Sequence, residues 1–412
     1  MTPLATSSWL QALPKGLQQL SEQHLLRTRR QVAPAQGAHI TVDGQRMLQF
    51  CSNDYLGLSQ HPALVEAARQ GALECGVGAG GSPMVNGHTA ANAELEEALA
   101  RYVQLPRALY FYAGFATNAS VIAALVGAED AIFSDALNHA SLIDGCRLSR
   151  ARIHRYAHAD LRELERLLAS NPQQRKLVVS DAVFSMDGDV ADMTGLLALC
   201  EQYDALLMLD DAHGFGMRGP QGRGSLAAVG LSGANASARI LYMGTLSKAA
   251  GVAGGFVAGS ESLIEWLLQR TRSYTFATAA PGMLARALLV GLSVLEQGDG
   301  LRAHLQAQIV RLRQGLEPLL AATGWQLLPS DTPIQALVIG DNAQALQLME
   351  VLRQRGIWVP AIRPPTVPEG TARLRIALSA NHTDADVAQL IAALHAGVLA
   401  MQQDLRPEPA KP

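Results

Sequence analysis

Short β-rich runs alternate with helical patterns between residues 106 and 259, and few folds accommodate such a sequence. Some of these runs are continuously apolar, for example Leu206-Leu207-Met208-Leu209, as is typical of strands buried on both faces of a sheet. The alternation predicts a mainly parallel sheet with helices on both sides. The expected strands are 108–112, 131–134, 152–156, 177–181, 206–210, 240–244 and 255–258.

Two further regions flank this pattern. A helical region at 281–322, with a break near 298–300, leads to a second βα pattern with expected strands 337–339, 357–359 and 374–377. Before the sheet, a segment with helical spacing at 7–30 looks like an arm that packs on something, and Asp43-Gly44 between β-type residues predicts a hairpin over 40–48. We therefore expect an arm and hairpin at 1–60, a large domain at 61–295, a smaller α/β C-terminal domain at 296–402 and a tail at 403–412.

Composition excludes several classes of protein. Hydrophobic residues make up 49% of the 412 residues and the net charge is −3, which fits neither a disordered chain nor a polybasic nucleic-acid binder. The four cysteines contain no CxxC pair, which argues against a zinc knuckle or a disulfide framework. Because the N-terminus lacks a signal-peptide pattern and no apolar run approaches about 18 residues, we expect a cytoplasmic protein without membrane contact.

The motif Asp210-Asp211-Ala212-His213-Gly214 directly follows an expected buried strand. Ligands of open α/β sheets bind at the carboxyl edge, so Asp210 and His213 are both expected to reach a ligand there. Asp and His three residues apart can bind a metal. Alternatively, the carboxylate stabilises a protonated ring nitrogen while the histidine holds an oxygen of the same ring. A third possibility is that these are only capping and turn residues.

Lys248 follows the next strand, in Thr245-Leu246-Ser247-Lys248, and small residues come after it. A partly buried lysine has a lowered pKa and suits a Schiff base, and small neighbours leave room for a flat cofactor. The alternative is an ordinary exposed lysine. The neighbouring motifs favour the Schiff base.

Other strand ends carry groups suited to the same ligand. Gly114 opens a helix, where free N–H groups can cradle a phosphate. His139 also opens a helix and is able to stack on a cofactor, act as acid or base, or cap the helix. Ser185 follows another strand and is either a donor to a ligand oxygen or a turn residue. Together these ends indicate one flat, phosphorylated ligand that forms a Schiff base through its carbonyl group.

Four motifs in order resemble those of the α-oxoamine synthases: Ser52-Asn-Asp-Tyr-Leu-Gly-Leu58, Asn138-His-Ala-Ser-Leu142, Phe184-Ser-Met-Asp-Gly-Asp189 and Asp210-Asp-Ala-His-Gly214. The resemblance covers about residues 19–399. It implies the aspartate aminotransferase-like fold (fold type I), pyridoxal 5'-phosphate as cofactor, no metal, and condensation of an amino acid with an acyl thioester with loss of carbon dioxide. A homodimer with its active site at the subunit interface is also implied.

The C-terminal stretch 361–375 is similar to one branch of this family. That branch joins L-alanine to a pimeloyl thioester in biotin biosynthesis, whereas other branches use glycine or serine. Whether the acyl group is carried as pimeloyl-coenzyme A or as pimeloyl-acyl carrier protein stays open.

The resemblance also implies a role for each matching residue. Lys248 would hold the cofactor as a Schiff base, Asp210 would pair with its pyridinium nitrogen, and His139 would stack on the ring and contact substrate. These three are the expected catalytic residues. The other expected cofactor contacts are Gly114, Phe115, Ser185, His213, Thr245 and, from a neighbouring subunit, Thr278.

Arg375 resembles the family arginine that takes the amino-acid carboxylate, a task that suits a bidentate guanidinium. The other expected substrate contacts, beside His139, are Arg27, Asn53 and Thr366, with Arg29 and Arg30 close to Arg27.

Two other functions compete with this hypothesis. A metal-dependent hydrolase would place Asp210, His213 and His139 around a divalent ion. A non-catalytic partner subunit would keep the fold without the Schiff-base lysine, and the presence of Lys248 argues against it.

Overall fold

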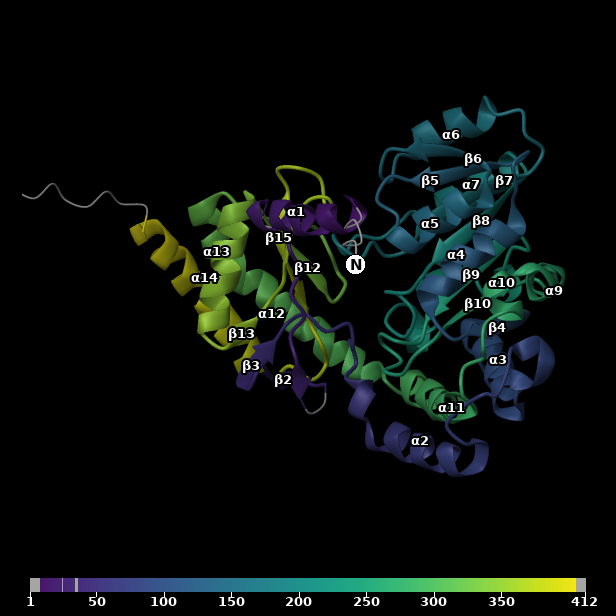
Figure 1. Ribbon diagram of the computed structural model, residues 1–412, viewed down its shortest axis with the longest axis horizontal. Helices are drawn as coiled ribbons and strands as arrows, with labels where there is room; N and C mark the ends of the chain where they lie inside the picture. Colours follow the sequence, from purple (N-terminus) through teal and green to yellow (C-terminus); the bar gives the residue numbers. More distant parts are fainter. Residues whose placement is uncertain (1–7, 24, 34–35, 405–412) are drawn as a thin grey trace, which may run out of the picture.

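The expected alternation is confirmed by a seven-stranded sheet in the computed structural model, which describes residues 8–23, 25–33 and 36–404, with side chains as far as Met401 (Figure 1). β10 runs antiparallel to both of its neighbours, β4 and β9, and the remaining pairs are parallel. In spatial order the strands are β4 (Arg107–Phe111), β10 (Gly255–Gly259), β9 (Ile240–Thr245), β8 (Ala205–Asp210), β7 (Lys176–Asp181), β5 (Ala131–Asp135) and β6 (Arg152–Tyr156).

Both faces of this sheet are covered by helices, because its central strands are apolar on both sides. In β7, Leu177 and Val179 pack into one core cluster while Val178 packs into another, as the alternation of side chains along a strand requires. One face packs against α4 (Gly114–Leu125), α5 (Ala140–Ser149), α9 (Glu261–Arg270) and α10 (Arg272–Thr275), and the other against α3 (Ala90–Val103), α6 (Leu161–Ala169) and α7 (Met193–Gln202).

Two smaller sheets lie in the other half of the molecule (Figure 1). The order of the first is β11 (Gln326–Leu327), β12 (Ile334–Gly340), β15 (Ala372–Ala377) and β14 (Ala361–Ile362). The order of the second is β1 (Val32–Ala33), β2 (His39–Val42), β3 (Gln45–Gln49) and β13 (Ile357–Trp358). The predicted hairpin is confirmed: β2 pairs with β3, and Asp43 and Gly44 form the turn with φ of 49° and 82°.

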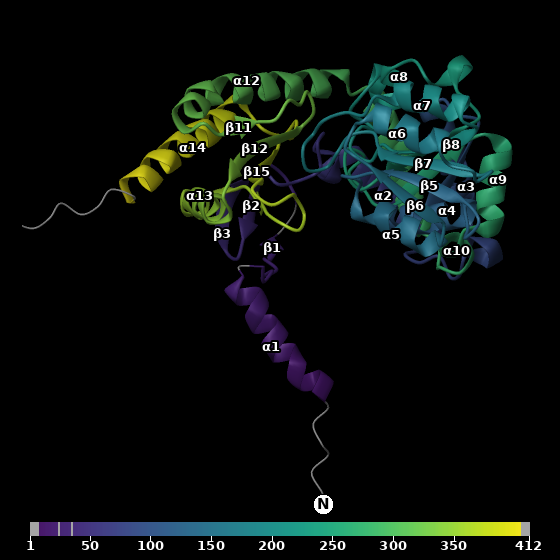
Figure 2. The ribbon, with the colours of Figure 1, turned by 90° about the horizontal axis from the view of Figure 1, so that it is seen from above.

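The long helical region is also confirmed, with its break. Helix α11 (Gly282–Glu296) ends just before α12 (Asp299–Thr323) begins. Figures 1 and 2 show that α12 runs from the large sheet to the C-terminal sheets, where it packs beside α14 (Asp384–Asp404); α13 (Asn342–Gln354) packs beside α14 as well. The other helices are α2 (Pro62–Cys75), α8 (Ser225–Ala228), and the short η1 (Leu58–Gln60), η2 (Pro83–Gly87), η3 (Pro220–Gly222) and η4 (Gly233–Asn235).

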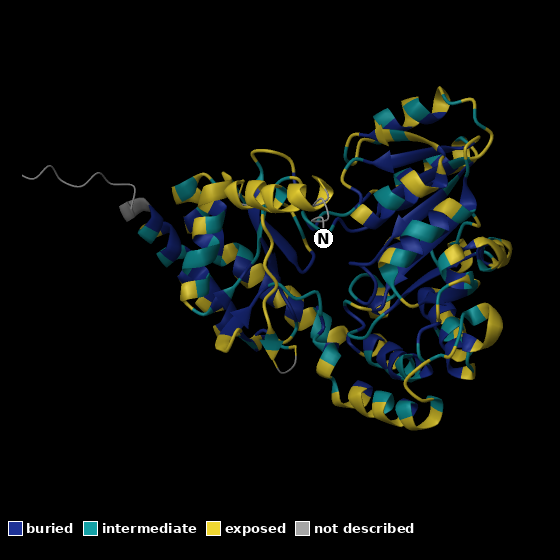
Figure 3. Ribbon diagram, in the orientation of Figure 1, coloured by how far each residue is buried: buried dark blue, intermediate teal, exposed yellow. Residues whose placement is uncertain are grey.

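The N-terminal helix α1 (Ser8–Glu22) is shorter than the expected segment and has no buried residue. Figure 3 shows it as an almost wholly exposed element. The expectation that this arm packs on something is therefore not met within the described part of this single chain. Its exposed apolar residues are Trp9, Leu10, Leu13, Leu17 and Leu20.

Within the described ranges, α14 is the one helix long and apolar enough to cross a membrane by length and composition. Its side chains Val387, Leu390 and Leu394 are fully buried in the main core cluster. Core helices of globular proteins have the same composition, so α14 carries no separate argument for a membrane.

Candidate functional site

The carboxyl ends of neighbouring strands bring the predicted motifs to one edge of the large sheet. Asp210 is the last residue of β8 and pairs in register with Asp181 at the end of β7. Thr245 ends β9, and the chain continues from it to Lys248. Besides the ends of β7, β8 and β9, strand β15 of the C-terminal sheet contributes to this edge, because it places Arg375 there. The site therefore lies where the large sheet meets the C-terminal half.

Lys248 and His213 are in direct contact at this edge. Nζ of Lys248 lies 2.9 Å from Nε2 of His213, and the hydroxyl of Tyr55 lies 2.6 Å from Nδ1 of the same ring. Burial lowers the pKa of Lys248 to about 8, although the charge of Asp210 opposes that shift. Burial and the charge of Lys248 lower the pKa of His213 well below its usual range. The geometry thus supplies a neutral imidazole beside an amine that loses its proton near neutral pH.

Asp210 is held by donors on both carboxylate oxygens. The side chain of Asn118 donates to Oδ2 at 2.6 Å, and the backbone N–H of Ala212 donates to Oδ1 at 2.9 Å. Asn118 lies on α4 and also donates to the hydroxyl of Ser141 at 2.9 Å. Asp210 is 3% exposed. A buried, oriented carboxylate of this kind is suited to stabilise a positively charged ring nitrogen.

His139 is fixed at the N-terminus of α5. Its backbone N–H donates to Oδ2 of Asp181 at 2.7 Å, and its Nδ1 lies 2.7 Å from the hydroxyl of Ser141. The ring meets that of Phe115 edge to face, with centroids 6.4 Å apart. Burial and the neighbouring charge of Asp210 raise the pKa of Asp181 well above its usual range. His139 thus lies at the site with its backbone anchored to the sheet.

The chain is closely packed at the N-terminus of α4, where two glycines leave no room for a side chain. A Cβ atom on Gly114 would lie 3.1 Å from Oγ1 of Thr245, and one on Gly255 would lie 2.7 Å from Cα of Gly114. The N-cap residue Ala113 provides no side-chain acceptor for the first-turn N–H groups. Oγ1 of Thr245 donates to the carbonyl of Gly254 at 3.1 Å. Free N–H groups, a helix dipole and glycines without side chains suit a phosphate.

Arg375 links several predicted residues. Its Nε donates to the backbone carbonyl of Ser185 at 2.6 Å, and its Nη2 donates to Oδ1 of Asn53 at 3.3 Å. The same Nη2 lies 3.5 Å from the hydroxyl of Tyr55. The guanidinium is buried and faces the group that contains Lys248 and His213. A cation in this position can receive a carboxylate.

A comparison with known families agrees with this geometry. Residues 45–394 match the model of the family described as aminotransferase class I and II. This chain belongs to that family. The matched range includes all of the strand ends described above.

Individual members of the aminotransferase class I and II family are similar over nearly the whole chain. The 8-amino-7-oxononanoate synthase of Paracidovorax citrulli (strain AAC00-1) is 69% identical over 387 residues, which are 94% of this chain and 94% of that protein. A solved structure of serine palmitoyltransferase (SPT) with an internal aldimine of pyridoxal phosphate (PLP) has a TM-score of 0.88 at 28% identity. The match covers 97% of this chain and 100% of that one. The solved structure of 8-amino-7-oxononanoate synthase from Francisella tularensis has a TM-score of 0.73 at 29% identity. That match covers 86% of this chain and 99% of the other.

Not every predicted residue of this family member joins the central group. Thr366 lines a neighbouring cavity of about 550 Å³, together with Asn138 and Phe184. Arg27 is exposed, and its charge helps to lower the pKa of Arg363, whose carbonyl accepts from the N–H of Thr366. Arg27 is therefore close enough to Arg363 for their charges to repel.

Thr278 is exposed in the loop after α10. Its expected contact is with a cofactor bound by a second subunit. A single chain does not test that contact, which stays a prediction.

The residues that would hold a metal in the competing hypothesis are arranged differently. Both ring nitrogens of His213 are already engaged, by Lys248 and Tyr55. Among the residues that the structure describes, no group of three or more His, Cys, Asp or Glu side chains is placed to hold an ion. The geometry gives the metal-dependent hydrolase no support.

Three site residues were missed from the sequence: Tyr55, Asn118 and Asp181. Tyr55 lies inside the motif 52–58, Asn118 lies four residues after Gly114, and Asp181 ends an apolar strand run. Membership in a strand-end motif was the available signal. Their partners were not predictable, because each contact joins segments far apart in the chain.

Proposed function

We propose that this chain catalyses the reaction of the 8-amino-7-oxononanoate synthases. L-alanine and a pimeloyl thioester condense to 8-amino-7-oxononanoate, and the carrier thiol and carbon dioxide are released, as a step of biotin biosynthesis. The observation that carries the proposal is the half-buried Lys248, whose desolvated amine has a pKa of about 8, at the same sheet edge as Asp210 and His213. The 69% identity to a relative of that name, over 94% of both chains, supports the choice of reaction.

The residues at the sheet edge fit pyridoxal 5'-phosphate. The N-terminus of α4 at Gly114, with its first-turn N–H groups and the hydroxyl of Thr245 close by, would take the phosphate. Asp210 would hold the ring nitrogen, His213 and Ser185 the ring hydroxyl, and Phe115 and His139 would lie against the ring. Lys248 would hold the group covalently. When bound, the cofactor acts as an electron sink for negative charge at the α-carbon of the amino acid.

The chain's own residues then perform the proton transfers. Once the amino acid has displaced it, the amine of Lys248 takes the proton from the α-carbon and returns one after condensation. A pKa of about 8 suits both directions, since the amine is present in both protonation states near neutral pH. His213, held by Tyr55 at 2.6 Å, keeps a neutral nitrogen toward that amine. Asp210 supplies the negative charge that keeps the ring nitrogen protonated.

Arg375 would receive the carboxylate of L-alanine, with Asn53 beside it at 3.3 Å. The acyl donor would occupy the 550 Å³ cavity that Thr366 lines, with Arg27, close to Arg363, as a further contact. Phe184 and Met186 supply apolar wall for an acyl chain. Arg147 and Arg155, which also line this cavity, supply positive charge for the phosphate that coenzyme A and a carrier-protein arm share. The proposal also includes a homodimer in the cytoplasm, with Thr278 reaching the phosphate across the subunit interface.

The test uses purified protein loaded with pyridoxal phosphate. Mixed with L-alanine and pimeloyl-coenzyme A, it is expected to release free thiol and to form 8-amino-7-oxononanoate, detected by mass spectrometry. Pimeloyl-acyl carrier protein is tested in parallel as the alternative donor. No product with either donor, from protein that shows the absorbance of bound cofactor, contradicts the proposal.

A related reaction with serine or glycine is the second candidate, because the SPT structure superposes with a TM-score of 0.88. The same assay with each amino acid and with palmitoyl-coenzyme A separates the two. Faster thiol release with serine or glycine than with alanine would keep the chemistry and change the substrate.

A further inference from the structure

The loop that carries Ser185 is the tip of a small hairpin beyond β7. Val183 and Val190 form an antiparallel bridge, and the N–H of Phe184 donates to the carbonyl of Asp189 at 3.0 Å. The four residues 185–188 lie between these pairs. Since a two-stranded hairpin is marginally stable alone, its position depends on what holds it.

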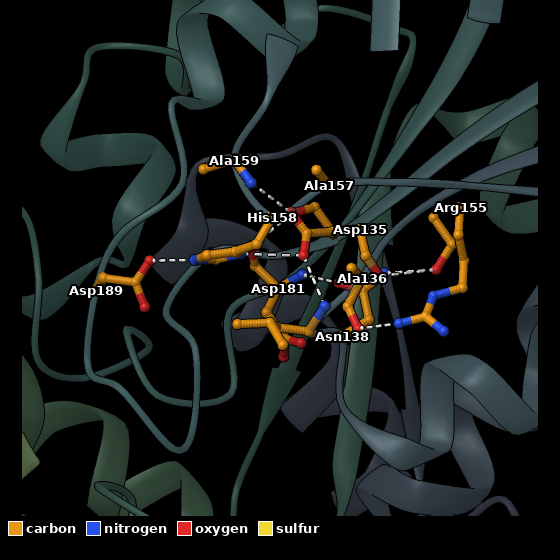
Figure 4. Close-up of polar contacts among 12 residues, drawn as sticks. Asp135, Ala136, Asn138, Arg155, Ala157, His158, Ala159, Asp181 and Asp189 are labelled. Carbon is orange, nitrogen blue, oxygen red and sulfur yellow. Dashed lines mark hydrogen bonds and ion pairs between the residues drawn. The ribbon is translucent and has the colours of Figure 1, made fainter. Parts of the chain in front are cut away.

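On the side of the large sheet, His158 lies between two carboxylates (Figure 4). Its Nδ1 is 3.0 Å from Oδ1 of Asp135, at the end of β5, and its Nε2 is 2.8 Å from Oδ2 of Asp189 in the hairpin. The ring also meets that of Phe184 edge to face, with centroids 4.4 Å apart. A carboxylate accepts hydrogen bonds, so both ring nitrogens donate and the imidazole is charged. The two carboxylates raise the pKa of His158 to about 10, against the effect of burial.

The position of Asp135 is fixed by hydrogen bonds from two backbone N–H groups. Its carboxylate is almost fully buried and accepts from the N–H of Leu137 at 2.8 Å and from the N–H of Ala159 at 2.9 Å. Figure 4 shows this group beside Asp181 and Asn138, the residues that fix the start of α5. The bridge from Asp135 through His158 thus ties the hairpin to the edge of the sheet where the site lies.

On the other side, the hairpin tip is bound to the C-terminal half. Arg375 donates to the carbonyl of Ser185 at 2.6 Å, and Arg373 pairs with Asp187. The hydroxyl of Ser330 donates to the carbonyl of Gly188 at 2.9 Å. The tip therefore joins the two halves of the molecule, and Arg375 is placed partly by the backbone of Ser185.

We propose that His158 is a positioning residue for the reaction: as a cation between Asp135 and Asp189, it fixes the hairpin tip and thereby sets Ser185 and Arg375. The inference rests on the proposed roles of Ser185 toward the cofactor and of Arg375 toward the amino-acid carboxylate. His158 does not itself touch the reacting groups. Its loss is expected to weaken binding of both ligands.

The test is His158→Gln, whose neutral amide is able to donate to one carboxylate but not to both. His154→Gln is the matched control, because His154 lies on β6, the strand that ends two residues before His158, and its ring stacks on Phe133 at 5.2 Å and bonds Asn171. Absorbance titrations give the dissociation constants of pyridoxal phosphate and, without any acyl donor, of L-alanine. Both constants are expected to rise about tenfold in His158→Gln and to stay within about twofold of wild type in His154→Gln.

A purely structural role for His158 makes a different prediction. It would lower the melting temperature of His158→Gln and leave both dissociation constants within about twofold of wild type, and that result overturns the proposal. If His158→Gln does not fold, Asp189→Ala removes the acceptor of the bond from Nε2 at a half-buried site and is expected to raise the same two constants. Neither titration needs a pimeloyl thioester, so wild-type protein that binds both ligands without forming product would contradict the proposed function alone.

Discussion

The amine of Lys248 lies 2.9 Å from Nε2 of His213; the histidine is buried, and the half-buried lysine has its amine end removed from water. Because a neutral imidazole and a buried amine share this contact, the lysine is oriented and its charged form is disfavoured. Ordinary surface lysines have neither property. This relationship distinguishes Lys248 from the other lysines and makes it the first residue to test.

Lys248→Ala is expected to lower turnover by at least about a thousandfold, because both the covalent link to the cofactor and the proton acceptor are lost. The fold should persist, since the side chain removed is only half-buried and its contact is to the imidazole of His213. Thiol release and circular dichroism measure the two effects. Lys176→Ala is the control, as this lysine bonds the carbonyl of Tyr203 at the start of β7, away from the site. Near-normal turnover of Lys248→Ala would refute the assignment.

The lowered pKa of Lys248 predicts how cofactor capture depends on pH. Only the neutral amine attacks a carbonyl, so the rate at which protein stripped of cofactor takes up pyridoxal phosphate should rise with pH and level off above about 8. An ordinary lysine would show the same rise about two pH units higher. The rate of absorbance gain after mixing, measured from about pH 6.5 to 10, decides between them.

Asp210→Asn tests the charge at the ring nitrogen. The amide keeps the shape of the side chain but removes the negative charge, so turnover should fall by about a hundredfold or more. The cofactor should still bind, because the proposed phosphate site at the N-terminus of α4 is unchanged. Asp204→Asn is the control, since Asp204 precedes the same strand β8 and is exposed, where it pairs with Arg239. Equal turnover in the two variants would remove Asp210 from the mechanism.

Much of this architecture was predictable from patterns of short range. Strand β8 was predicted from its continuous apolar run, and the position of Asp210 at its end followed from the rule that ligands bind at the carboxyl edge. The turn at Asp43-Gly44 was predictable because its conformation depends on those two residues themselves.

Contacts between distant segments were not predictable from patterns. Tyr55 meets His213 across 158 positions of sequence, and β3 pairs with β13 to join the N-terminal hairpin to the C-terminal half. Periodicity shows which face of an element is buried but not which element covers it. The same limit hid His158, whose two carboxylate partners come from a different strand and from a hairpin.

Gly114→Ala tests the proposed phosphate site at the N-terminus of α4 by adding a single methyl group. The new Cβ would lie 3.1 Å from Oγ1 of Thr245 and 3.2 Å from Cε of Met243, so these side chains would have to shift at the place where the phosphate is proposed to bind. We expect the dissociation constant of pyridoxal phosphate to rise about tenfold. Stability without cofactor should change little, because the gain in helix propensity, at most about 1 kcal/mol, is offset by these two tight contacts.

Gly127→Ala is the matched control for that substitution, since nothing lies within 4 Å of its added Cβ and its φ is not in the left-handed region. It is expected to leave the affinity for the cofactor unchanged. Spectroscopic titration gives the affinity, and thermal melting of the cofactor-free proteins gives the stability. If Gly114→Ala bound the cofactor as well as Gly127→Ala does, the phosphate would have to lie elsewhere. Loss of affinity together with a lower melting temperature would instead show that the methyl group destabilises the protein around α4 and does not act on phosphate binding alone.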